Sequence, residues 1–153
     1  MSVDSFLDTN VLIYAVSSSP AESGKKERAL ELIQHADFGL SAQVLQEFYV
    51  NVTRKIAVPL APDEAVALLE QFKSFPVVWT DYPLIVAGIE AALRFGISYW
   101  DGAIIAAAER LGATTLYTED LSHGQHYGSV QAVNPFRSGS PDSVHESRGT
   151  QYD

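Results

Sequence analysis

The segment that decides the fold reads SFLDTNVLIY, at positions 5–14. We expect a strand over residues 3–7, because its last residues are apolar and the acid Asp8 follows directly. Residues 11–16 are apolar throughout, which is typical of a short buried helix. The segment therefore predicts a strand that carries a carboxylate at its end and passes at once into a helix.

The same alternation of short strand-like runs and longer helical patterns continues along the chain. Further strands are expected at 38–40, 77–79, 114–117 and 130–133, the last of them at the edge of the sheet. Helices are expected at 21–36, 44–52, 83–95 and 98–111, with one more beginning at Pro62. Helices between strands provide the crossover connections that parallel strands need. The pattern predicts an α/β fold in which helices cover both faces of a parallel sheet.

The composition sets the class of protein. The chain has 153 residues, 46% of them hydrophobic, so we expect one domain over 1–136 with a disordered polar tail at 137–153. There are no cysteines, which excludes disulfides, thiolate zinc sites and thiol nucleophiles. No apolar run approaches the roughly 18 residues of a membrane span, and the first residues lack a secretory signal. We therefore expect a cytoplasmic protein without membrane contact.

The net charge restricts the ligands. Nineteen acids against ten bases give a formal charge of −9. A domain that held nucleic acid by its own charge alone would be basic, with a pI above about 9. Either nucleic acid is not the ligand, or a positive group lies between it and the acids.

Three acids lie at or just beyond points where the pattern changes: Asp8 and Asp120 follow strands, and Asp101 lies in the first turn of a helix. Glu47 differs, because it lies inside a helix on the flank of its apolar face. Carboxylates gathered at one sheet edge would repel one another and raise each other's pKa values. A divalent cation removes this repulsion, and ligands that are all oxygen suit Mg²⁺ or Mn²⁺ better than zinc.

Each acid also has a simpler explanation. Asp8 is placed as a helix N-cap, and Asp101 completes a capping box with Ser98. Glu47 alone reads as a solvated helix residue, and Asp120 as a turn residue. The sequence around Asp8 and Asp101 favours function, because one follows a strand directly and the other begins a helix of small, aliphatic residues.

The blocks at 6–14, 45–49, 98–108 and 116–121 resemble, in order and spacing, those of a PIN domain, and most closely the ribonucleases of the VapC toxin type. The resemblance implies a three-layer α/β/α sandwich with a central parallel sheet. It also implies a metal-dependent endoribonuclease that uses Mg²⁺ or Mn²⁺. The residues that it assigns are Asp8 as the central metal ligand, Glu47 and Asp101 as the other core acids, Asp120 as a fourth, and Thr9, Asn10 and Thr118 as polar groups that orient them.

The adjacent acids Glu119 and Asp120 leave open which of the two faces the metal. We choose Asp120, because the Thr118-x-Asp120 spacing matches the family's usual pattern. The resemblance further implies an RNA substrate (tRNA or rRNA), a cognate antitoxin as partner and a homodimer. The candidates for contacts with flanking RNA phosphates are Lys25, Lys26, Arg28, Arg54 and Lys55.

Other interpretations fit less well. A haloacid dehalogenase-like phosphatase would need an acid where Asn10 stands, and 23–26 lacks the spacing of a phosphate-binding loop. We interpret 123–126, with its two histidines, as a polar loop. A receiver-like binding module would need a lysine after the last strand, and this chain has none there. A non-catalytic PIN-like scaffold that binds RNA or a partner protein stays as the alternative.

Overall fold

A computed structural model describes residues 2–137, and the predicted tail, apart from Arg137, lies outside the described residues. A six-stranded sheet with the order β3-β2-β1-β4-β6-β5 forms the centre of the molecule. All neighbouring strands are parallel except β5 and β6. The strands are β1 (Ser5–Leu7), β2 (Phe38–Ser41), β3 (Val77–Val78), β4 (Thr115–Tyr117), β5 (His126–Tyr127) and β6 (Val130–Val133).

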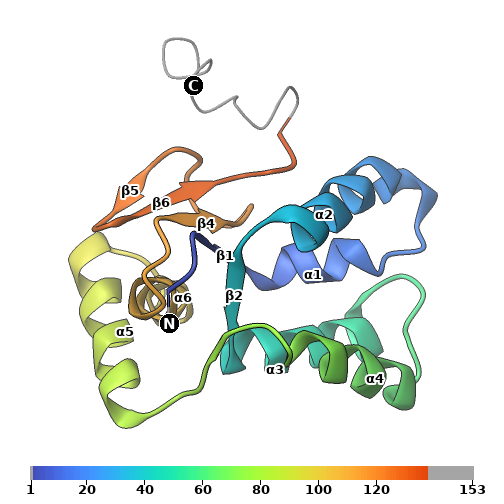
Figure 1. Ribbon diagram of the computed structural model, residues 1–153, viewed down its shortest axis with the longest axis horizontal. Helices are drawn as coiled ribbons and strands as arrows, with labels where there is room; N and C mark the ends of the chain where they lie inside the picture. The colour runs from blue at the N-terminus through green and yellow to red at the C-terminus, as the bar shows by residue number, and fades with distance from the viewer. Residues whose placement is uncertain (1, 138–153) are drawn as a thin grey trace.

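Helices flank this sheet, as the sequence predicts. Figure 1 shows α1 and α2 on one side of the central strands, with α5 and α6 on the other. The helices are α1 (Thr9–Ala15), α2 (Ser23–His35), α3 (Ala42–Val50), α4 (Pro62–Phe72), α5 (Tyr82–Phe95) and α6 (Tyr99–Arg110), with a 3₁₀ turn η1 (Pro20–Glu22) and a π-helical turn η2 (Asn51–Lys55). No helix within residues 2–137 is long and apolar enough to cross a membrane.

The prediction that 130–133 forms an edge strand is wrong. β5 pairs antiparallel with the outer side of β6, with Tyr127 opposite Val130. The two-residue turn between them begins at Gly128, whose φ of 66° suits glycine. His126 is therefore part of a strand, and only the first part of 123–126 is the expected loop.

The tightest helix contact in the fold fixes the start of α6. A Cβ atom on Gly102 would lie 2.5 Å from the Gly88 carbonyl oxygen and 2.7 Å from the Ala92 nitrogen, so only glycine allows α5 and α6 to approach this closely. Gly96 ends α5 with a φ of 66°, as expected from the sequence. The first turn of α6, which contains Asp101, is thereby held against α5.

The core lies between the sheet and both sets of helices. Its largest fully buried side chains are Phe6, Phe48, Leu7, Leu12, Leu40, Ile105 and Leu116. Because β1 lies between β2 and β4, the carboxyl end of β1 is enclosed by structure on both sides. Asp8 lies at this end.

Candidate functional site

Asp8 is the most enclosed acid of the site. Its residue is 5% exposed and forms the N-cap of α1. Oδ1 accepts a hydrogen bond from the Thr9 backbone N–H at 2.7 Å, and Oδ2 accepts one from the Thr118 hydroxyl at 2.8 Å. Burial raises the pKa of Asp8 to about 7, although the hydrogen bonds from Thr118 and Thr9 oppose that rise. The predicted capping role is confirmed, but it accounts for only one of the two carboxylate oxygens.

The end of β4 supplies the second part of the site. Thr118 is fully buried, and its hydroxyl oxygen also accepts a hydrogen bond from the Asp120 backbone N–H at 3.0 Å. The Asn10 amide donates to Asp120 Oδ2 at 3.2 Å. Partial burial raises the pKa of Asp120, and the negative charges of Asp101, Glu119 and Glu47 add to this rise. Asp120 therefore lies within the electrostatic reach of the other acids.

Glu47 is held at the same place by two donors. The Thr9 hydroxyl donates to Oε1 at 2.7 Å, and the Gln43 amide donates to Oε2 at 3.1 Å. Thr9 joins Glu47 to Asp8, because its hydroxyl donates to Glu47 and its backbone N–H donates to Asp8. The negative charge of Glu47 adds to the rise in the pKa of Asp8. Glu47 therefore lies beside Asp8 and is not a freely solvated helix residue.

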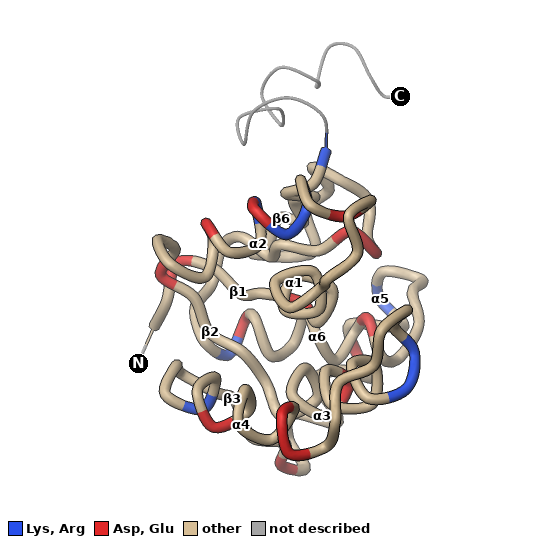
Figure 2. The backbone as a smooth tube through the Cα atoms, turned by 90° about the vertical axis from the view of Figure 1, so that its right-hand side faces the viewer, with Lys and Arg blue, Asp and Glu red and all other residues tan. Residues whose placement is uncertain are grey.

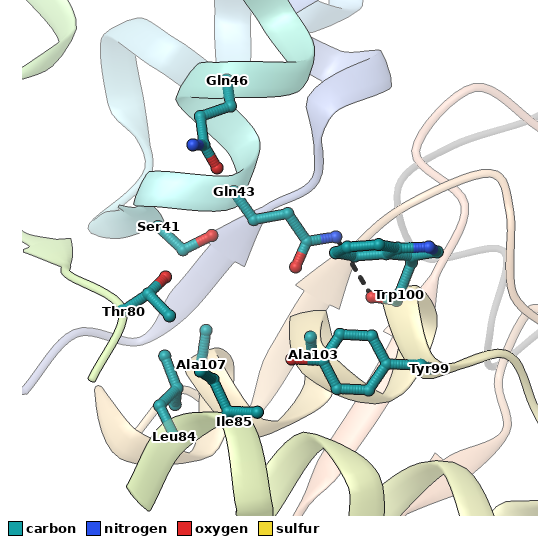
Figure 3. Close-up of a pocket in the computed structure, with 10 residues that line it drawn as sticks. All are labelled: Ser41, Gln43, Gln46, Thr80, Leu84, Ile85, Tyr99, Trp100, Ala103 and Ala107. Carbon is teal, nitrogen blue, oxygen red and sulfur yellow. Dashed lines mark hydrogen bonds between the residues drawn. The ribbon is translucent and has the colours of Figure 1, made fainter. Parts of the chain in front are cut away.

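Gln43 is a site residue that the sequence analysis missed. Its amide nitrogen also donates to the Trp100 carbonyl oxygen at 3.2 Å, which joins α3 to the first turn of α6 (Figure 3). Its signal in the sequence is its place four residues before Glu47, which puts both side chains on one helix face.

Asp101 lies beside that contact. Its backbone N–H donates to the Ser98 hydroxyl at 3.0 Å, which confirms Ser98 as the N-cap of α6. The residue is partly exposed, and its negative charge adds to the rise in the pKa of Asp120. The charges of Asp120 and Glu47 likewise add to the rise in the pKa of Asp8.

The PIN domain family matches residues 5–127 of the chain. The chain belongs to the PIN domain family. Three solved structures show the same fold, all at low identity. The crystal structure of Mycobacterium tuberculosis VapC20, a toxin that cleaves the sarcin–ricin loop, is 19% identical, with a TM-score of 0.62 over 76% of this chain and 90% of that one. A toxin–antitoxin complex from Klebsiella pneumoniae is 14% identical, with a TM-score of 0.64 over 86% and 98%. FitAB bound to a DNA fragment is 24% identical, with a TM-score of 0.59 over 88% and 97%. No curated protein shows significant similarity to the chain.

The two adjacent acids of this PIN domain have different surroundings. Glu119 accepts a hydrogen bond from the Tyr14 hydroxyl at 2.6 Å and one from Lys25 at 3.4 Å. Asp120 instead contacts Asn10 and Thr118. Glu119 therefore contacts α1 and α2, whereas Asp120 shares the hydroxyl of Thr118 with Asp8.

The predicted basic contacts come from two separate elements of the PIN domain. Lys25 and Arg28, on α2, form ion pairs with Glu119 at 3.4 Å and Glu31 at 2.7 Å. Arg54 and Lys55 are exposed at the end of η2, while Lys26 is partly exposed on α2. Figure 2 shows Lys and Arg scattered among acidic segments in that view. The structure does not gather these five side chains on one element.

PIN-domain nucleases typically use a divalent metal, and the donor set here fits such an ion in part. All candidate ligands are oxygens, and the Asn10 side-chain oxygen is buried with no hydrogen-bond partner among the described residues. The burial of Asp8 without a cationic partner also suits a cation, because a positive charge would favour the ionised carboxylate. As the side chains lie, however, no three His, Cys, Asp or Glu residues within 2–137 form a group that could hold a metal ion. The carboxylates of Asp8, Glu47 and Asp120 instead accept hydrogen bonds from neighbouring neutral groups.

Proposed function

We propose that this PIN domain is a metal-dependent endoribonuclease that hydrolyses phosphodiester bonds of tRNA or rRNA, and that it is the toxin of a type II toxin–antitoxin pair. The observation that carries the proposal is the buried Asp8 carboxylate. It receives hydrogen bonds from Thr9 and Thr118 and is repelled by Asp120 and Glu47. Such an arrangement is costly to build unless a cation and an anionic substrate use it. VapC20, which has the same fold, is a toxin that cleaves the sarcin–ricin loop.

In this proposal Asp8, Glu47, Asp101 and Asp120 hold Mg²⁺ or Mn²⁺. When bound, such an ion offsets the charge of the phosphodiester and lowers the pKa of water. The residues around the acids supply their orientation. Thr9 and Thr118 direct the two oxygens of Asp8, and Thr9 and Gln43 direct those of Glu47.

Because water rather than the ribose 2′-hydroxyl attacks, the expected products carry a 5′-phosphate and a 3′-hydroxyl. The test is incubation of purified protein with tRNA or rRNA and Mg²⁺, followed by analysis of the fragment ends. We expect cleavage that EDTA abolishes and that Asp8→Asn abolishes as well. Asp63→Asn, at an exposed acid on α4, is the matched control and should cleave normally. Full activity in EDTA would contradict the metal-dependent mechanism.

The second candidate is a non-catalytic scaffold that binds RNA or a partner protein. The absence of a ready group of three ligands among residues 2–137 favours it. A scaffold of this kind would show no Mg²⁺-dependent cleavage of any of the RNAs above. Its ligand would bind equally well to wild type and to Asp8→Asn.

The proposed antitoxin has a candidate binding groove on α3, the helix that carries Glu47. A groove of about 740 Å³ runs between α3 and α4 and is lined mainly by apolar side chains, among them Leu45, Tyr49, Val50 and Leu69. We propose that an apolar antitoxin segment occupies it and directs a basic side chain towards the acids. Leu45→Glu should then prevent inhibition by the antitoxin, measured as residual RNA cleavage in a titration.

The proposed homodimer has a candidate interface on α5. Tyr82, Ile85, Ile89 and Leu93 follow one another at helical spacing and are all exposed. Apolar side chains exposed along one helix face mark an interaction surface. We propose that a second copy of the chain covers this stripe.

A further inference from the structure

A cavity of about 240 Å³ lies between α3, α5 and α6 (Figure 3). Its lining combines the aromatic rings of Tyr99 and Trp100, the aliphatic side chains of Leu84 and Ile85, and the amides of Gln43 and Gln46. None of the described residues that line it carries a charge. A cavity of this kind suits a flat, uncharged, hydrogen-bonding group rather than a phosphate.

The cavity is joined to the acidic site by Gln43. This side chain donates to the Glu47 carboxylate at 3.1 Å and to the Trp100 carbonyl oxygen at 3.2 Å, so it belongs to both places. Trp100 also directly precedes Asp101 in the first turn of α6. A group in the cavity would therefore lie next to a phosphate at the acids.

Trp100 is exposed, although burial of its side chain would lower the free energy of the protein. Its residue is 63% exposed, although indole is among the most apolar of surfaces. Its ring meets Tyr99 edge to face with centroids 5.0 Å apart. Tyr99 in turn packs against α5, where a Cβ atom on Gly88 would come within 3.2 Å of its ring. The indole is thus fixed from one side and remains open to a ligand.

We propose that this cavity is a nucleobase subsite, in which one unstacked base of the RNA lies against Trp100 beside the scissile phosphate. The inference rests on the proposed function and names how that site engages its substrate. Proteins that recognise single-stranded RNA stack splayed bases on aromatic side chains and read their edges with polar groups. Gln43 and the exposed Gln46, one helical turn apart on α3, are placed to contact the base edge. Stacking also adds affinity without positive charge, which suits a chain of net charge −9.

The test measures the affinity for RNA after removal of one base, of the Trp100 indole, and of both. A fluorescein-labelled single-stranded RNA of about ten nucleotides, within the span of a small binding domain, is made with one abasic ribose at each position in turn. Affinities are measured with Mg²⁺ in an Asp8→Asn background, so that the RNA stays intact. The series is repeated with Trp100→Ala, with Trp100→Phe, and with Trp79→Ala, a tryptophan of nearly the same exposure (62%) that does not line the cavity.

We expect loss of one particular base to weaken binding by roughly 5- to 150-fold, the range for one base stacked on an aromatic ring. Trp100→Ala should weaken binding of the intact RNA similarly and abolish the further effect of removing that base, because the two changes delete one contact. Trp100→Phe and Trp79→Ala should keep the effect of base removal.

An equal effect at every position, or the same effect of base removal in Trp100→Ala as in the parent, overturns the inference. If Trp100→Ala dissociates a dimer in sedimentation while the effect of base removal persists, a second copy, and not a base, covers the indole. Failure of the nuclease proposal is seen separately, as absence of Mg²⁺-dependent cleavage by the protein with Asp8 intact.

Discussion

The Thr118 hydroxyl donates to Asp8 Oδ2 across 2.8 Å, although 110 residues separate the two in the chain. The register of the sheet produces this contact. Leu7 of β1 lies opposite Tyr117 of β4 in a parallel pair, so the residues that follow, Asp8 and Thr118, leave the sheet side by side. Two short strands therefore determine where the central carboxylate of the site points.

Thr118→Val should impair the site without unfolding the protein, because valine has nearly the same shape but cannot donate a hydrogen bond. The Mg²⁺ concentration for half-maximal RNA cleavage should rise by about 10- to 100-fold, as for other partners that orient metal ligands. Thr118→Ser, which restores the hydroxyl, should return it close to wild type. An unchanged Mg²⁺ requirement in Thr118→Val would contradict the orienting role of Thr118.

The stability of the metal-free protein should fall as pH rises from about 4 to about 7. Burial raises the pKa of Asp8 from 3.8 to about 7 in the folded protein, so over this range the unfolded chain binds fewer protons than the folded one. The effect is on the order of a few kcal/mol at full ionisation. Thermal unfolding in EDTA at about pH 5 and about pH 8 measures it.

Asp8→Asn should remove most of this pH dependence and raise the unfolding temperature above that of wild type on the alkaline side. Asp63→Asn, on the exposed start of α4, should retain the wild-type dependence. If the unfolding temperature falls by the same amount with rising pH in wild type and in Asp8→Asn, burial of Asp8 does not cause the pH dependence.

Replacing each of the two adjacent acids by its amide should separate their roles. Asp120→Asn should lower the rate of RNA cleavage by about 10- to 100-fold, because it weakens a ligand of the metal. Glu119→Gln should keep the rate within about threefold, since it changes a surface ion pair with Lys25 of small energy. Initial rates at saturating Mg²⁺ give the comparison, and the reverse order would assign Glu119 to the metal.

Gly102→Ala should destabilise the protein, because its Cβ atom would lie 2.5 Å from the Gly88 carbonyl oxygen. Overpacking of this kind costs about 1–3 kcal/mol, which urea denaturation can measure. The matched control is Gly24→Ala on α2, where nothing lies within 4 Å of the new atom, and which should be neutral or stabilising. Equal stability of both variants would show that α5 and α6 can move apart at little cost in free energy.

Ile89→Glu should leave the fold intact and produce monomers, since it places a charge in the middle of the exposed stripe on α5. Sedimentation velocity gives the mass, and circular dichroism monitors the fold. Glu90→Ala, next to it on the same helix, is the control and should sediment as wild type does. A monomeric wild-type protein would refute the proposed dimer.

The sequence predicts most of the fold because its local signals agree with the tertiary structure. The strand before Asp8, the N-cap at Ser98 and the stop at Gly96 each depend on near neighbours, and each is confirmed. β5 is only two residues long, which is too short to leave a periodic pattern, so the sequence predicts 130–133 as the edge strand instead.

Contacts between residues far apart in the chain explain why the sequence does not predict the rest of the site. The link from Gln43 to Trp100 joins residues 57 apart, and that from Lys25 to Glu119 joins residues 94 apart. Neither contact can be predicted from local sequence patterns, because each forms only when separate elements of the fold pack together. The sequence could therefore name Lys25 as a basic residue but not show that its charge is used by Glu119.

The central strand of the sheet is made first, and its partner β4 is made more than a hundred residues later. Until residues 115–120 have emerged during synthesis, Asp8 lacks Thr118, and Asp120 does not yet exist. A domain that cuts RNA, as proposed above, would damage the cell that translates it if it became active too early. With this order of strands, the growing polypeptide would stay inactive until nearly the whole domain has left the ribosome.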